Sequence, residues 1–176
     1  MPSWGGEAPG VMARERPTMR PNPQIVEKLV EATREVFETM VFRSLTTGVP
    51  IEGDALRPSS NVVGTVGFAG SQSGLVAFYS TLDAAREITG AMLGIEPSQV
   101  NGEVPDAIGE ITNMIAGSFR TKMAAEGDAW AISVPTVTVG SDFYIKPMVT
   151  GQRVLVPFRM GEAEVFVELI LMRHPR

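Results

Sequence analysis

The stretch from residue 104 to residue 123 restricts the fold of this chain more than any other, because its apolar residues recur with the period of an α-helix. At about 100° per residue, one side of that helix carries Ile108, Ile111, Ile115 and Phe119, with Thr112 and Met123 at its edge. The opposite side carries Asp106, Glu110, Asn113, Gly117 and Arg120. The pattern predicts a helix that packs its apolar side on a core and turns a carboxylate and a carboxamide outward, one turn apart.

Three further features of this helix are informative. Pro105 suits the first helical position, and Gly127 suits the position just past the end. Gly117, within the outward row, costs about 1 kcal/mol relative to alanine in a helix. Either another backbone comes close at Gly117, or a small residue is tolerated there without a role.

The composition excludes several kinds of chemistry. The 176 residues include no cysteine and one histidine, His174, which excludes thiolate nucleophiles, Ser-His triads and histidine or cysteine metal sites. The net charge of -5 argues against binding to nucleic acid or to anionic lipid. No apolar run approaches the roughly 18 residues of a membrane span. The lack of cysteine is typical of the cytoplasm, so we expect a cytoplasmic protein.

The N-terminal part of the chain divides into a tail and a helix. Residues 1–22 are rich in proline and glycine, which predicts a flexible tail before a single domain at 23–176. Asn22 offers an N-cap and Pro23 a first helical position for a helix that runs to about Arg43. The charged residues of this helix are interpreted as a solvated face with no further role: Glu27, Lys28, Glu31, Arg34, Glu35 and Glu38.

The remaining segments group helices with helices and strands with strands. After a loop at 44–60, the β-like runs 61–69 and 75–79 predict a hairpin. Residues 80–83 resemble a capping box that begins with Ser80 and opens a second helix, which Gly94 closes. Three runs rich in β-branched and aromatic residues follow the helix at 104–123, at 130–139, 153–160 and 164–172. Pro135 and Pro157 indicate edge positions or bulges within them.

This grouping fixes the predicted fold class. The order α-ββ-αα-βββ predicts an α+β fold, with helices packed on a largely antiparallel sheet. The runs at 153–160 and 164–172 are long, apolar and expected near a sheet edge, which is a liability unless another chain covers them.

The outward row of the helix at 104–123 resembles the signature helix of the CheC/CheX/FliY phosphatases of bacterial chemotaxis. Their pattern is Asp or Ser, three residues, Glu, two residues and Asn, and Asp106, Glu110 and Asn113 match it. The run Asn-Met-Ile-Ala-Gly at 113–117 is characteristic of the CheX branch, and residues 132–137 resemble the family's Ser-Leu-Pro-Thr-Val strand. The resemblance covers roughly residues 23–172. Since the helix at 23–43 carries no second motif of this kind, the resemblance favours the CheX type.

The resemblance implies a phosphatase that acts on the phospho-aspartate of a CheY-like response-regulator receiver domain. It implies two catalytic residues: Asn113 orients the attacking water, and Glu110 pairs with the lysine beside the receiver's phospho-aspartate. An acyl phosphate already has a good carboxylate leaving group, so placing a water in line is what remains, and a carboxamide can do this. The resemblance implies no cofactor or metal of the protein's own, because the Mg²⁺ is expected in the receiver.

Three neighbouring residues are expected at the partner surface, each beside another interpretation. Asp106 suits the first turn of a helix whatever else it does, because the helix dipole favours an acid there. Met114 is either a flexible apolar contact or part of the core. Gly117 is expected to clear space beside an inserted Asn113.

The resemblance also implies a homodimer that forms through the sheet and leaves the signature helices facing solvent. Two other functions stay open. The chain is then either a non-catalytic adaptor that binds a receiver or a structural component like the FliY part of a flagellar switch.

Overall fold

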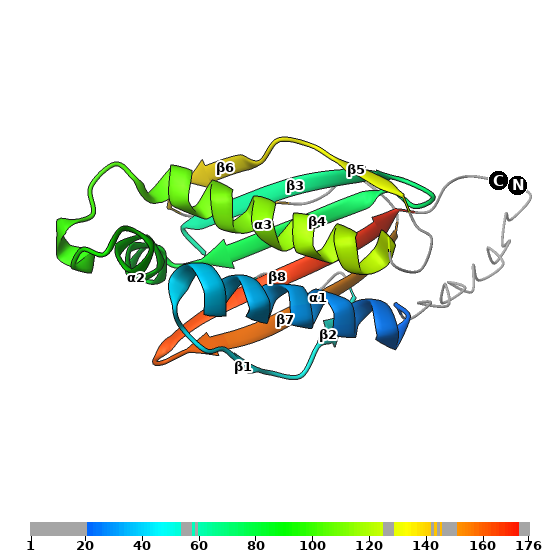
Figure 1. The fold of residues 1–176 in the computed structure, drawn as a ribbon, viewed down its shortest axis with the longest axis horizontal. Helices are drawn as coiled ribbons and strands as arrows, with labels where there is room; N and C mark the ends of the chain where they lie inside the picture. The colour runs from blue at the N-terminus through cyan, green and yellow to red at the C-terminus, as the bar shows by residue number, and fades with distance from the viewer. Residues whose placement is uncertain are drawn as a thin grey trace, which may run out of the picture.

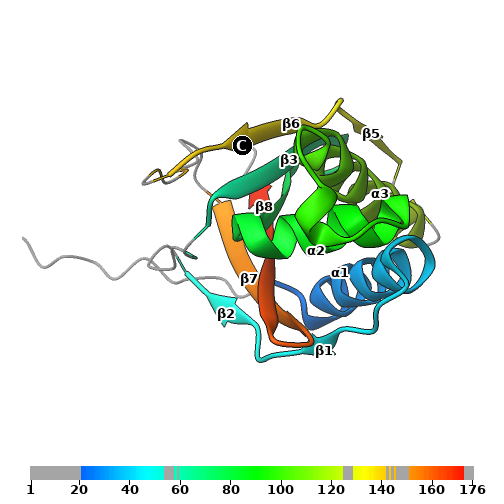
Figure 2. The same cartoon turned by 90° about the vertical axis from the view of Figure 1, so that its left-hand side faces the viewer.

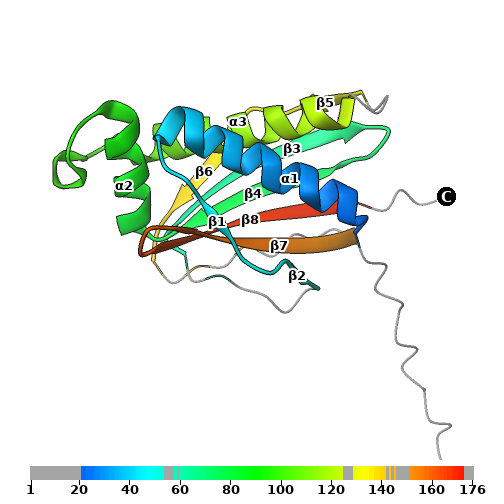
Figure 3. The same cartoon turned by 60° about the horizontal axis from the view of Figure 1, so that its bottom comes forward.

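Two long helices lie antiparallel and side by side across one face of a β-sheet in the computed structural model of the chain (Figure 1). They are α1 (Pro23–Val36) and α3 (Val104–Ala124), and the shorter α2 (Leu82–Leu93) lies at one end of the sheet. Figure 2 shows all three helices on the same side of the sheet, and Figure 3 shows α1 and α3 along its strands. The structure describes residues 21–53, 58, 60–124, 129–141, 143, 145 and 151–172.

The described strands form one antiparallel sheet, which confirms the predicted α+β fold. The order is β1-β7-β8-β4-β3-β5, with β2 also paired to β7 and β6 to β3. The strands are β1 (Thr46–Thr47), β2 (Ile51–Glu52), β3 (Val62–Gly70), β4 (Gly74–Ser80), β5 (Trp130–Ile132), β6 (Thr136–Val139), β7 (Gly151–Met160) and β8 (Ala163–Met172). The predicted hairpin is β3 and β4, and the last two predicted runs are β7 and β8.

Three details of the strand prediction differ from the structure. The predicted loop at 44–60 contains β1 and β2, which pair with β7. The run at 130–139 is two strands, because the strand is interrupted around Pro135. Among the described strands both pair with β3 alone, so the predicted edge position is confirmed. The run at 164–172 was wrongly predicted near an edge, because β8 pairs with β7 on one side and β4 on the other. Pro157 lies on β7 between the positions that pair with β2 and β1.

The helix starts follow side-chain capping. Asn22 accepts a hydrogen bond from the backbone N–H of Gln24 at 3.0 Å, as expected for an N-cap before Pro23. The predicted capping box at 80–83 was wrong, because Ser80 is the buried last residue of β4. Instead, Thr81 caps α2 through a hydrogen bond to its Oγ1 from the backbone N–H of Ala84, at 3.2 Å.

The helix ends are less regular. The helix predicted to reach Arg43 changes after α1 into a π-helical turn, η1 (Phe37–Val41), and Phe42 ends it with a φ of 56°. Gly94 closes α2 in the left-handed region, as predicted. The proposed tail, Gly127 and His174 lie wholly or almost wholly outside the described residues, so those predictions are not tested.

The core lies between the helices and the sheet, and the predicted apolar side of α3 is buried in it. Ile108, Ile111 and Ile115 have no exposed surface. Toward its C-terminal end, α3 is held by aromatic contacts: Phe119 lies with its ring centroid 5.5 Å from that of Trp130. Trp130 in turn stacks on Phe68 at 4.5 Å, which joins α3 to β5 and β3.

The other face of the sheet buries a polar group among apolar neighbours. The Oε2 of Glu168 accepts a hydrogen bond from the Tyr79 hydroxyl at 2.6 Å, and its Oε1 accepts one from Nε of Arg153 at 2.8 Å. Burial and the adjacent Glu168 carboxylate raise the pKa of Tyr79. Phe143 and Ile145 pack beside this group. This face lies on the opposite side of the sheet from α3.

Candidate functional site on helix α3

The five residues predicted on the outward side of α3 form one accessible row. Asp106 and Glu110 are exposed, while Asn113, Gly117 and Arg120 are half-buried. The predicted buried side holds as well, since Thr112 and Met123 are buried together with the large apolar residues of the stripe. The sidedness derived from helical periodicity is therefore confirmed.

The height and rotation of α3 are set by close contacts with the strands beneath it. A side chain on Gly64 of β3 would collide with the Oγ1 of Thr112, so the helix rests directly on the strand backbone there. The Oγ1 of Thr112 is itself held by donating a hydrogen bond to the carbonyl of Ile108 at 2.7 Å. On the side of β6, a Cβ on Gly109 would lie 3.4 Å from Val137. These contacts fix the direction in which the outward row faces.

Glu110 and Asn113 lie three residues apart, so they are about 4.5 Å apart along the helix axis. Neither side chain makes a hydrogen bond or an ion pair anywhere in the described part of the chain, and the same is true of Asp106. A carboxylate offers acceptors only, whereas a carboxamide offers both an acceptor and two donors. The pair therefore presents an acceptor-only group beside a group that both donates and accepts, and no described residue of the protein binds either of them.

Gly117 and Met114 border a depression beside Asn113. The depression has a volume of about 430 Å³ and is lined by Glu35, Val36, Thr39, Asn113, Met114, Gly117, Ser118, Arg120, Thr121 and Ile132. A Cβ built on Gly117 meets no atom within 4 Å, so no backbone of the described chain comes close there. Met114 is half-buried and packs on the edge of the core, so it joins the core to the depression.

Glu35 of α1, which lines this depression, has a different environment from the one predicted from the sequence. Glu35 was assigned to a solvated face without a role, yet its Oε2 accepts a hydrogen bond from the Ser118 hydroxyl at 3.0 Å. The Lys122 ammonium lies 3.2 Å from the same carboxylate. The Ser118 hydroxyl, followed by Lys122, lowers the pKa of Glu35. Periodicity within one helix carries no signal of this kind, because the contact joins residues that are far apart in sequence.

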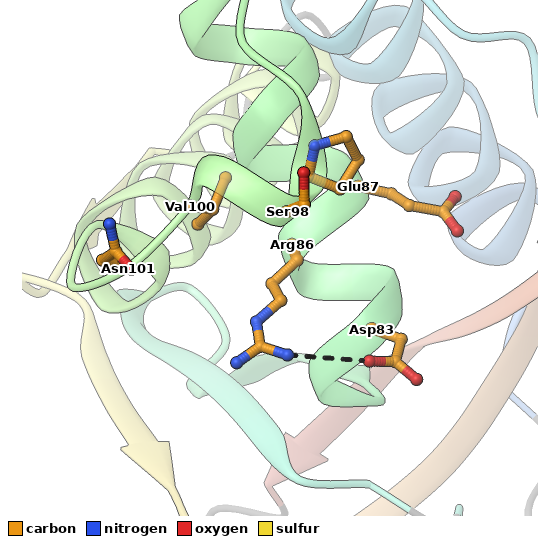
Figure 4. Close-up of a pocket in the computed structure, with 7 residues that line it drawn as sticks. Asp83, Arg86, Glu87, Ser98, Val100 and Asn101 are labelled. Carbon is orange, nitrogen blue, oxygen red and sulfur yellow. Dashed lines mark ion pairs between the residues drawn. The ribbon is translucent and has the colours of Figure 1, made fainter.

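A second depression lies away from the outward row, where α2 meets the short helix η2 (Pro97–Gln99). Figure 4 shows its charged residues, with the Arg86 guanidinium near Asp83 and the Glu87 carboxylate pointing away from both. The Arg86–Asp83 pair is long, at 3.9 Å, and solvent-exposed, so it contributes little. None of the predicted site residues lines this depression.

Across residues 21–172, as far as they are described, no three His, Cys, Asp or Glu side chains gather closely enough to hold a metal ion. None of the helices in the same described segments combines the length and apolarity that crossing a membrane requires.

Known proteins resemble the chain in sequence and in fold. The sequence model of the family described as "Chemotaxis phosphatase CheX" matches residues 62–159, more than half of the chain, including all of α3. The CheY-P phosphatase CheX of Thermotoga maritima is 28% identical over 124 residues, which cover 70% of this chain and 80% of that protein.

Two solved structures extend the likeness to three dimensions. The chemotaxis protein CheX of Desulfovibrio desulfuricans superposes with a TM-score of 0.77 at 27% identity, covering 84% of this chain and 99% of that one. A CheX–CheY–BeF3–Mg²⁺ complex from Borrelia burgdorferi shares the fold at a TM-score of 0.72 and 21% identity, covering 85% and 98%. The chain therefore belongs to the chemotaxis phosphatase CheX family.

Proposed function

We propose that this protein hydrolyses the phospho-aspartate of a CheY-like receiver domain at the outward side of α3. The relative from Thermotoga maritima is described as a phosphatase of CheY-P, and the neighbour from Borrelia burgdorferi was solved with CheY. Both descriptions support a phosphorylated receiver as the substrate of this chain. The reaction joins a water oxygen to phosphorus, breaks the bond between phosphorus and the aspartate oxygen, and releases inorganic phosphate and the receiver's carboxylate.

One observation carries this proposal: Glu110 and Asn113 stand one turn apart on an accessible helix face, with no partner among the described residues. In the proposed complex, the Asn113 carboxamide enters the receiver's site and hydrogen-bonds the attacking water, which it holds in line with the leaving oxygen. Because the aspartate carboxylate leaves readily, no strong general base is needed.

Glu110 acts in docking as well as in the assembled site. Its carboxylate pairs with the lysine beside the receiver's phospho-aspartate, which fixes the register of Asn113 against the phosphoryl group. A carboxylate this close to phosphate would repel it unless a cation stood between them. Pairing with lysine therefore makes Glu110 compatible with the substrate.

Three neighbours complete the proposed partner surface. Asp106 lies one turn before Glu110 and is exposed, so it can meet a donor at the rim of the contact. Met114 offers an adaptable apolar surface at the depression. Gly117 leaves open the space that the receiver needs beside Asn113.

We further propose that the protein holds no metal or cofactor of its own and that the reaction uses the Mg²⁺ of the receiver. That Mg²⁺ offsets charge on the phosphoryl oxygens while the carboxamide positions the water. Chelation should therefore stop phosphate release by removing the receiver's ion, and it should leave the folding of this chain unchanged. A fall in the unfolding temperature of the isolated protein in EDTA would contradict this part of the proposal.

The test of the proposed function is release of inorganic phosphate from the CheY-like receiver domains of the source organism, each charged with acetyl phosphate. We expect one receiver to lose phosphate much faster with the protein than without it, and the Asn113→Ala variant to abolish most of the gain. Tight binding of a charged receiver without faster release would instead identify the chain as an adaptor. A protein that neither binds nor dephosphorylates any receiver would favour a structural role.

We also propose a homodimer whose two α3 outward rows face solvent. The edge strands of the described sheet are the two-residue β1 and β2 on one side and β5 and β6 on the other. Edge strands leave backbone N–H and C=O groups available to pair with another chain. Light scattering at micromolar concentration should give twice the mass of one chain. The mass of a single chain would overturn the proposal.

A further inference from the structure

Arg120 is the one member of the outward row that the proposed function has not used. It lies seven residues beyond Asn113, which places it about 10 Å further along the helix. It lines both the depression beside Asn113 and another depression that Trp130 and Ala131 also line. The residue is half-buried, and it stands on the same accessible row as Glu110 and Asn113.

The guanidinium of Arg120 makes no hydrogen bond or ion pair with any other residue in the described part of the chain. The basic residue that follows it by two positions, Lys122, is engaged by Glu35 and Glu31 at 3.2 and 3.8 Å. Glu35 also lines the depression, but its carboxylate is already bound by Ser118 and Lys122. A guanidinium carries five donors in a fixed fork, and no described residue supplies an acceptor to them, so they are available to a partner.

The charges along the outward side of α3 change sign from one end to the other. Asp106 and Glu110 stand near the N-terminal end, Asn113 and Gly117 follow without charge, and Arg120 stands about 15 Å beyond Glu110. The open space at Gly117 separates the acidic end from the basic end. A partner that docks along this row meets opposite charges at its two ends, so only one direction of docking satisfies both.

We propose that Arg120 binds an acidic side chain on the surface of the receiver and thereby sets the direction in which the receiver lies along α3. This inference rests on the proposed function, because it names the second anchor of the same docking surface. The fork of the guanidinium matches a carboxylate in two parallel hydrogen bonds, which a lysine cannot reproduce. In the reverse orientation, the receiver's lysine would face Arg120 and its acid would face Glu110, and both contacts would repel.

The predicted consequence is a separation of association from turnover. Arg120→Ala should raise KM about tenfold and leave kcat within about twofold, because the contact forms equally in the bound state and in the transition state. Arg120→Glu should raise KM further, and Arg120→Lys should restore only part of the loss. The matched control is Arg159→Ala on β7, which removes the same charge from an exposed position on the other face of the sheet. That control should leave KM near the wild-type value.

Salt and a phosphoryl mimic supply a second readout. The KM of the wild-type protein should rise with ionic strength more steeply than that of Arg120→Ala, because the variant has lost a screened charge pair. Binding to a receiver loaded with beryllofluoride and Mg²⁺, measured without turnover, should weaken about tenfold in the same variant.

Each alternative outcome has a distinct meaning. A kcat that falls with an unchanged KM in Arg120→Ala would place the guanidinium on the phosphoryl group and overturn the proposal. Equal KM values for Arg120→Ala, the Arg159→Ala control and the wild type would overturn it as well. If the wild type releases no phosphate, the proposed function fails, while the binding measurement still tests Arg120. Arg120→Gln keeps the side-chain length and serves in place of alanine if the latter unfolds.

Discussion

The Oγ1 of Thr112 on α3 occupies the space that any side chain on Gly64 of β3 would need. The same oxygen donates a hydrogen bond to Ile108 at 2.7 Å, so it cannot rotate away without leaving a buried donor unpaired. Thr112 is the residue directly before Asn113. The contact between helix and strand therefore fixes the backbone position from which the Asn113 side chain projects.

This relationship predicts that Gly64→Ala destabilises the protein. The added methyl group must displace α3 from β3, which should cost about 1–3 kcal/mol, the usual range for overpacking. Urea unfolding monitored by circular dichroism would measure the loss. Gly67→Ala on the same strand is the control, because its Cβ would lie 3.7 Å from Ser133 in ordinary contact. Equal stability of the two variants would show that the helix can move at no cost.

Periodicity predicted α3 well because both of its sides depend on residues within the helix. Which residues are buried and which are accessible follows from spacing alone, and Glu110 and Asn113 stand where that spacing placed them. Contacts between segments that are distant in sequence could not be predicted in this way. Glu35 reaches Ser118 across two helices, 83 residues apart. The interior place of β8 likewise follows from strand order, which a list of apolar runs does not contain.

The contact between Glu35 and Ser118 predicts a pH dependence of stability. The hydrogen bond from Ser118 and the neighbouring Lys122 lower the pKa of Glu35 in the folded protein. In the unfolded chain that pKa is higher, so the unfolded state takes up a proton first as the pH falls. The stabilisation is therefore present above the unfolded pKa and is lost as the pH falls through the folded pKa.

Glu35→Gln should thus lower the urea midpoint slightly at about pH 6, and its difference from the wild type should shrink as the pH falls below the usual range of a carboxyl pKa. The effect is small because the Glu35 side chain is 57% exposed. Glu38→Gln is the control, since Glu38 is exposed on η1 and forms no ion pair within the described residues. A difference between Glu35→Gln and the wild type that grows toward acid pH would have the wrong sign.

Gly117 allows docking to be separated from folding. No atom lies within 4 Å of a Cβ at this position, so the isolated protein has room for a larger residue. Gly117→Leu should keep or raise the unfolding temperature, because replacing a helical glycine gains about 1 kcal/mol. The leucine should at the same time fill the space beside Asn113 and raise the KM for the receiver at least tenfold.

Gly117→Ala is the matched variant for this comparison. It gains a similar helix propensity while adding only one methyl group, so its KM should rise much less than that of the leucine variant. If Gly117→Leu dephosphorylates the receiver with the wild-type KM, the space beside Asn113 is not part of the docking surface.

The roles of Asn113 and Glu110 separate in transient kinetics. If the carboxamide acts mainly when water attacks, Asn113→Ala should bind the charged receiver nearly normally and lose about 10²–10³-fold in kcat, as expected for removing one positioned transition-state hydrogen bond.

Glu110 takes part both in docking and in the assembled site, so Glu110→Ala should raise KM and lower kcat together. Glu110→Gln keeps the shape of the side chain and removes its charge. If Glu110 acts by pairing with the receiver's lysine, this variant should also raise KM and lower kcat. Stopped-flow measurements at saturating and sub-saturating receiver distinguish these cases. A saturated Asn113→Ala variant that works at the wild-type rate would show that the carboxamide does not orient the water, and that α3 serves only as a docking surface.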